Sequence, residues 1–96
     1  MLETGSLTGK VTDNQSQALP GVRVMLTGGY GPPQDKVQEV QVTDVNGKFT
    51  FIGLQPGYYA VKAELEGFSV GVYTNIVINL GINTTIGMIL QPAISE

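Results

Sequence analysis

Apolar and polar residues alternate along most of this chain in short runs, and glycine or proline separates one run from the next. Alternation with a period of two places successive side chains on opposite faces of a β-strand. The 13 glycines and 5 prolines among 96 residues supply turns at short intervals, and helix signals are almost missing. The pattern therefore predicts an all-β fold.

Seven runs alternate in this way, separated by turn signals about 8–12 residues apart. This predicts a seven-stranded antiparallel two-sheet sandwich of the transthyretin or immunoglobulin type. The length favours a single domain, residues 1–96, with an ordered core at about 6–91. The predicted inward sets are Leu7, Gly9 and Val11; Val22, Val24 and Leu26; Val40 and Val42; Phe49 and Phe51; Tyr59, Val61, Ala63 and Leu65; Ile76, Ile78 and Leu80; and Ile86, Met88 and Leu90.

Three turn segments are informative. Asn46-Gly47 gives the strongest hairpin signal, because both residues tolerate positive φ between two alternating runs. Gly53–Gly57 predicts a second tight turn, and the glycine- and proline-rich stretch Gly28–Asp35 predicts the longest loop.

The composition excludes much chemistry. Cysteine and histidine are absent, which excludes disulfides, thiolate or imidazole metal ligands, and Ser–His or Cys–His mechanisms. The net charge is −3 and the five cations are scattered, so we expect no nucleic-acid partner. No run approaches the ~20 apolar residues of a membrane span, so we expect no membrane insertion by this segment.

Three acidic groups have a functional and an ordinary interpretation. Asp44–Gly47 has the oxygen spacing of the first part of a calcium loop but lacks the later acidic ligand, so we predict a turn in which Asp44 bonds backbone amides. Asp13 is expected to form a similar Asx turn. Glu64 and Glu66 are expected on one strand face and could mimic the two catalytic carboxylates of a glycosidase. A solvated edge, however, lacks the cleft that acid catalysis needs. We therefore predict no catalytic, cofactor-binding or metal-binding residues.

Tyrosines are the remaining candidates for contact with a ligand. Tyr30 lies in the predicted loop, Tyr58 is on the opposite strand face from Tyr59, and Tyr73 begins the sixth run. Exposed flat rings stack on sugars or anchor protein partners. Tyr30, Tyr58 and Tyr73 are the candidate partner or glycan contacts.

Five segments carry turns beside strands in a recognisable order: GKVTD at 9–13, LPGVRV at 19–24, TDVNGKFTF at 43–51, LQPGYY at 54–59, and Gly67-Phe68. Together they resemble the carboxypeptidase regulatory-like family. That resemblance implies a transthyretin-like sandwich without catalytic residues, an appendage found beside metallocarboxypeptidase domains, in adhesins and in surface proteins. Residues 73–90, followed by 93–96, are similar to the copies that precede the plug of TonB-dependent outer-membrane receptors.

A further resemblance concerns collagen-adhesin B-type domains, which form an internal isopeptide bond between a buried lysine and an asparagine or aspartate, assisted by a glutamate. Val11 stands at the lysine position and Ala63 at the glutamate position. Lys10, one residue away, is expected on the opposite strand face. We therefore predict that this crosslink is absent.

These observations predict a non-enzymatic accessory domain, a structural spacer or protein-interaction module of a larger exported cell-envelope protein in the periplasm, outer membrane or cell surface. A carbohydrate-binding module is the alternative. Met1–Gly5 lacks the basic and apolar regions of a signal peptide, which fits either a cytosolic protein or a domain from a longer exported chain. Expected partners are neighbouring domains of the parent chain and a protein or glycan ligand. The isolated domain is expected to be a monomer without cofactors.

Overall fold

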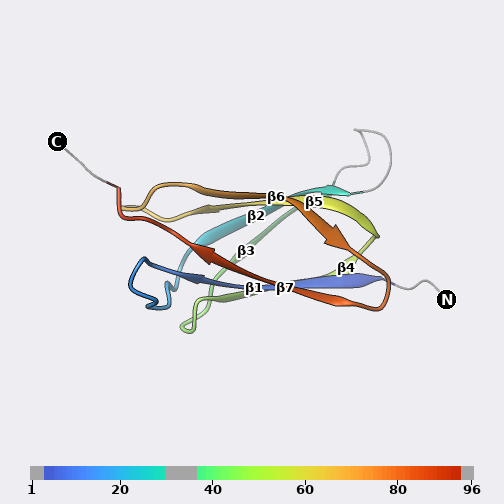
Figure 1. The fold of residues 1–96 in the computed structure, drawn as a ribbon, viewed down its shortest axis with the longest axis horizontal. Coiled ribbons are helices and arrows are strands. Elements are labelled where there is room, and N and C mark those ends of the chain that lie inside the picture. Colours follow the sequence, from blue (N-terminus) through green and yellow to red (C-terminus); the bar gives the residue numbers. More distant parts are fainter. Residues whose placement is uncertain (1–3, 30–36, 94–96) are drawn as a thin grey trace.

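The computed structural model describes residues 4–29 and 37–93, and these form a sandwich of two β-sheets (Figure 1). The seven-stranded all-β prediction is confirmed. No helix among the described residues is long and apolar enough to cross a membrane. The strands are β1 (Gly5–Thr12), β2 (Arg23–Gly29), β3 (Val37–Val42), β4 (Lys48–Leu54), β5 (Gly57–Glu64), β6 (Gly71–Ile78) and β7 (Asn83–Ile89).

One sheet has three strands in the order β4-β1-β7, and the other has four in the order β3-β2-β5-β6. The strand pairs are antiparallel, as predicted, except that β1 and β7 pair in parallel. Their register is unbroken from Ser6↔Asn83 to Thr12↔Ile89. The first and last strands therefore run side by side in the same direction.

The core lies between the sheets and consists mainly of the alternating apolar residues. Most of the predicted inward sets are buried, which confirms the face assignment for β1, β2, β4 and β5. Phe49 and Phe51 meet edge to face, with ring centroids 5.7 Å apart. The buried apolar residues are Leu7, Val11, Leu19, Val22, Val24, Leu26, Phe49, Phe51, Leu54, Tyr59, Val61, Ala63, Ile76, Ile78, Met88 and Leu90.

Three predicted core residues are exposed instead. Val40 and Val42 pair with Met25 and Arg23, whose side chains face outward, and Val42 is 61% exposed. Paired residues of adjacent strands share a face of the sheet, so both valines point to the outer face of this edge strand, and its inward positions carry Glu39 and Gln41. Leu80 is 50% exposed because β6 ends at Ile78 and the chain turns there.

The prediction of a hairpin at Asn46-Gly47 is wrong. The four-residue turn runs from Asp44 to Gly47, whose N–H donates to the Asp44 carbonyl at 2.9 Å, and only Gly47 has positive φ. This turn carries the chain from β3 in one sheet to β4 in the other. The tight turn after β4 also changes sheet, so both are arches across the sandwich rather than hairpins.

At two places within strands, an irregularity shifts the alternation of inward and outward side chains by one residue. In β4, Gly53 takes φ 69° and lets Leu54, predicted to lie in a turn, enter the core. In β6, two residues, Thr74 and Asn75, lie opposite the single residue Ala60 of β5, and Asn75 takes φ 61°. Such bulges bend a strand and redirect its side chains.

The predicted loop at Gly28–Asp35 begins later than expected, because Gly28 and Gly29 belong to β2. Gly28 has φ 118°, and a Cβ there would overlap the backbone of Tyr58 and Tyr59 in β5. The glycine therefore allows the end of β2 to approach β5 closely. Residues 30–36, including Tyr30, lie outside the described residues.

Candidate binding surface

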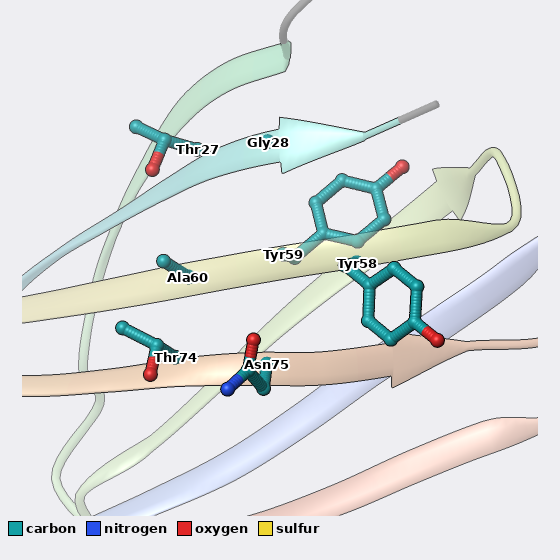
Figure 2. Close-up of a pocket in the computed structure, with 7 residues that line it drawn as sticks. All are labelled: Thr27, Gly28, Tyr58, Tyr59, Ala60, Thr74 and Asn75. Atoms are coloured by element: carbon teal, nitrogen blue, oxygen red, sulfur yellow. The ribbon is translucent and has the colours of Figure 1, made fainter. Parts of the chain in front are cut away.

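A shallow depression of about 270 Å³ lies on the wider sheet where β2, β5 and β6 run side by side (Figure 2). Ala60 pairs with Thr27 of β2 and lies opposite the bulge of β6. Its small side chain therefore lies between the longer side chains of these two strands. The residues that line the depression are Thr27, Gly28, Tyr58, Tyr59, Ala60, Thr74 and Asn75.

Tyr58 and the β6 bulge form one end of the depression. The Tyr58 side chain is exposed, and its ring lies beside Asn75 (Figure 2). Asn75 is one of two non-glycine residues with positive φ among the described residues, a conformation that asparagine tolerates better than most residues. The depression therefore combines an aromatic face with amide and hydroxyl groups.

Tyr59 contributes to the depression, although its ring packs into the core on the other side of β5. Its hydroxyl donates a hydrogen bond of 2.7 Å to the carbonyl of Gln55 in the turn before β5. Desolvation raises the pKa of Tyr59, Glu39 adds to this, and the bond to Gln55 opposes it. The neutral phenol is therefore favoured, as expected for a structural group.

The lining of the depression holds no carboxylate and no cation. The ion pair between Lys62 and Glu64, 3.6 Å long, lies outside it on β5. Glu66, predicted to share a strand face with Glu64, instead lies in the turn after β5. General acid–base catalysis requires a titratable proton donor or acceptor within reach of the bound molecule, and the titratable side chains of this lining are Tyr58 and Tyr59, of which Tyr59 is bonded to Gln55.

The structure brings only one of the candidate tyrosines to this depression. Tyr58 lines it, whereas Tyr73 pairs with the buried Val61 and thus lies toward the inner side of the sheet, 38% exposed. Tyr30 falls outside the described residues, so its predicted role remains a prediction. The sequence reasoning missed Thr27, Ala60, Thr74 and Asn75. The apolar pattern does not mark this bulge, because Val72, Ile76 and Ile78 keep the same parity along the sequence.

The two predicted Asx turns are present. Asp13 Oδ1 accepts bonds from the amides of Gln15 and Gln17 at 2.8 and 2.9 Å. Asp44 Oδ1 accepts from the amides of Asn46 and Lys48 at 2.9 and 3.0 Å. These bonds, led by that from Lys48, lower the pKa of Asp44. Among residues 4–29 and 37–93, no three acidic side chains gather as a cation site would require.

The residues at the lysine and glutamate positions of the isopeptide crosslink lie where the sequence predicts. Val11 and Ala63 are fully buried in facing sheets, and Lys10 is exposed on the outer face of β1. The lysine that is nearest in sequence to the required position therefore points away from the core. Absence of the crosslink remains a prediction.

Comparison with known protein families identifies the domain type. The carboxypeptidase regulatory-like domain matches residues 6–91. The chain belongs to that family. No curated protein matches the chain at a significant level.

Solved structures with this fold come from unrelated settings. The Bacillus anthracis TIE protein superposes with a TM-score of 0.78 at 17% identity, over 95% of this chain and 17% of that one. The minor pilin GBS52 of Streptococcus agalactiae gives 0.66 at 17% identity, over 98% and 47%. A catechol 1,2-dioxygenase from Acinetobacter radioresistens gives 0.75 at 11% identity, over 98% and 53%. This chain spans about half or less of each structure, and at such identities the likeness shows the fold alone.

Proposed function

We propose that this domain is a non-catalytic, in-line accessory module of a larger exported cell-envelope protein. The observation that carries the proposal is the parallel pairing of β1 with β7. Because these strands run in the same direction, the first strand begins at one end of the sandwich and the last strand finishes at the other (Figure 1). A parent chain would enter at one end and leave at the opposite end.

The shape supports a spacer role. The principal extents are 51 × 26 × 17 Å, and the strands run along the long dimension (Figure 1). Chain termini of a domain often lie close together, an arrangement that suits insertion into a loop of another domain. Termini at opposite ends instead suit a module threaded between two others.

The chemistry supports a role without catalysis. The depression on the wider sheet has no carboxylate or cation in its lining, and the chain has no cysteine or histidine. Acyl transfer by Ser–His or Cys–His pairs therefore has no residues to perform it. The family match and the pilin likeness favour an accessory domain at an exposed surface of the cell.

A finer proposal concerns the setting. The resemblance of residues 73–90 and 93–96 to copies that precede receptor plugs supports an N-terminal extension of a TonB-dependent outer-membrane receptor. The family match is compatible with this setting and with other envelope proteins.

An antibody raised against the domain tests both levels of the proposal. Immunoblots of fractionated source cells should show a polypeptide far larger than 10.2 kDa in the envelope fraction, with the purified domain as competitor. A band of receptor size in the outer membrane supports the finer proposal, whereas an envelope band of another size supports only the coarser one. A free 10.2 kDa band in the cytosolic fraction would contradict both.

A second candidate function, saccharide binding, is favoured by the exposed Tyr58 ring beside Asn75 and Thr74. A flat ring can stack on the apolar face of a sugar while amide and hydroxyl groups bond its hydroxyls. The depression of about 270 Å³ is at the lower limit of ligand sites, so it suits one sugar ring. Such a small contact offsets little of the cost of association, so we expect affinities no better than millimolar.

A glycan array followed by calorimetry tests this candidate. Tyr58→Ala should abolish binding of any hit, and Tyr73→Ala is the matched control because Tyr73 does not line the depression. A micromolar ligand that Tyr58→Ala abolishes would place saccharide binding above the spacer role. The absence of any hit, or equal loss with both variants, would remove the depression as a sugar site.

A further inference from the structure

The seam between β1 and β7 has a geometry with a mechanical consequence. Seven consecutive residue pairs join the strands in parallel, from Ser6↔Asn83 to Thr12↔Ile89. Backbone bonds continue the seam at both ends: Ser6 N–H donates to the Ile82 carbonyl at 3.1 Å, and Leu90 N–H donates to the Thr12 carbonyl at 2.9 Å. The seam therefore extends along the whole of β1 and β7.

Side chains reinforce the seam on both of its faces. On the outer face, the hydroxyls of Ser6 and Thr8 in β1 donate to Asn83 Oδ1 in β7, at 2.7 and 3.1 Å. On the inner face, Val11 pairs with Met88, and both are buried in the core. The strands cannot slide along each other without breaking backbone bonds, side-chain bonds and core packing at once.

Tension on the chain would load this seam in shear. A pull on the N-terminal side draws β1 toward the end where it begins, and a pull on the C-terminal side draws β7 toward the end where it finishes (Figure 1). The two paired strands are thus pulled in opposite directions along their length. Parallel ladders have evenly spaced bonds, so all pairs share the load.

We propose that β1 and β7 form a mechanical clamp that lets the domain transmit tension between its neighbours without unfolding. This inference rests on the proposed in-line role. Forced unfolding is governed by the unfolding rate, and that rate depends on how far the structure must move before it fails. The clamp acts through that distance and not through the equilibrium stability of the domain.

The expected strength follows from two distances. A slide of about 2 Å along the seam already carries its donors and acceptors out of hydrogen-bond range. Peeling the strands apart one pair at a time instead releases about 6–7 Å of chain for each pair, one residue from each strand. For the same work per pair, the force in shear is therefore at least about threefold higher than the force in peeling, because shear breaks all pairs together and peeling breaks them one at a time.

The segment after β7 lies outside the clamp and should detach first. Gln91 accepts a bond from the Ser69 amide, and the Ala93 amide donates to the Gly67 carbonyl, at 2.8 and 2.9 Å. These two bonds tie the segment to the turn region between β5 and β6. A small early extension should therefore precede the main unfolding event under tension.

Single-molecule force spectroscopy on the 96-residue chain between handles at its two ends tests the clamp. The comparison pulls between Thr4→Cys and Ile82→Cys, which are unique anchors because the chain has no cysteine. Thr4 accepts a bond from Gly81, next to Ile82, so these anchors lie together at one end of the seam and open it by peeling. The end-to-end unfolding force should be at least about threefold the force needed to pull Thr4→Cys and Ile82→Cys apart.

A matched pair of variants separates the clamp from general stability. Val11→Ala and Val61→Ala make the same change at fully buried positions, but only Val11 lies in the seam. Val11→Ala should lower the end-to-end force markedly, and Val61→Ala should lower it much less. Equal forces along the two axes, or equal losses from the two variants, would overturn the clamp. Neither result bears on where the parent protein resides, which the immunoblot tests separately.

Discussion

Single residues in this sandwich differ sharply in how much they contribute to stability, and two of its glycines show this. Gly9 in β1 pairs with Phe49, and a Cβ at Gly9 would overlap the Phe49 ring, which is itself buried. Gly87 in β7 has nothing within 4 Å of its Cβ position. Both are strand glycines in the same sheet, and alternation already places Gly9 on the inward face and Gly87 on the outward face, but only the structure shows that the Phe49 ring covers Gly9.

Gly9→Ala should therefore destabilise the domain by about 1–3 kcal/mol, because the displaced ring overpacks the core. Gly87→Ala should be neutral or stabilise by up to about 1 kcal/mol, because alanine restricts the unfolded chain more than glycine does. Urea denaturation of the two variants measures both changes. Equal destabilisation would show that the Phe49 ring does not cover Gly9.

Thr43 is the buried polar residue among the described residues, and its position in the segment 43–51 gives no sign of this burial. Its hydroxyl donates to the Leu19 carbonyl at 2.7 Å and accepts from the Val22 amide at 2.9 Å. One side chain thus fixes the turn that leads into β2.

Thr43→Val keeps the shape but leaves the Leu19 carbonyl and the Val22 amide without that partner. The expected loss is about 1–3 kcal/mol of unfolding free energy. Thr50→Val on the exposed face of β4 is the control and should change stability by less than about 0.5 kcal/mol. Similar values for both variants in denaturant melts would rule out the structural role of the Thr43 hydroxyl.

At the scale of elements, the arch between β3 and β4 depends on the charge of Asp44. Its carboxylate accepts two backbone amides, so the pKa lies below the ordinary value of 3.8. A carboxyl group with a lowered folded-state pKa contributes stability above its unfolded pKa, and that contribution is lost as the pH falls through the folded value.

Asp44→Asn should therefore make the free energy of unfolding less dependent on pH in the acid range. The difference in stability between wild type and variant should be present near neutral pH and shrink as the pH falls below about 3.8. Chemical denaturation at a series of pH values measures this difference. A difference that stays constant down to acid pH would contradict the role of the Asp44 charge.

Element by element, alternation predicts which residues share a face, but not which strands are covered or where parity changes. The pattern of Leu7 to Val11 is correct because β1 is the central strand of its sheet. Val40 and Val42 alternate just as clearly, yet the register of β3 with β2 turns them to the outer face of the sheet. Neighbours that are distant in the sequence decide that difference.

The arches and the depression could not be predicted from the sequence for the same reason, because each depends on strands that are distant in the sequence. Asn46-Gly47 is compatible with a hairpin or an arch, and the choice depends on which sheet receives β4. The bulge at Thr74 and Asn75 exists because Tyr73 and Ile76 must both face inward across one additional residue. The apolar residues Val72, Ile76 and Ile78 keep the same parity, so the sequence does not show the bulge, and the depression forms only when β2 and β5 lie beside it.

At the scale of the whole molecule, one topological feature links fold to function. The parallel pairing of β1 with β7 places the start of β1 and the end of β7 at opposite ends of an elongated sandwich (Figure 1). Both the in-line role and the mechanical clamp depend on that arrangement. Reversal of the last strand would remove both.

The most direct test of the in-line account is the distance between spin labels at Thr4→Cys and Ala93→Cys, measured by pulsed electron paramagnetic resonance. The chain has no other cysteine, so both labels are specific. At about 3.3 Å per residue along β1, the account predicts a narrow distribution centred beyond about 25 Å. A distribution centred below about 15 Å, less than five strand residues, would place both ends on one side of the domain and contradict the account.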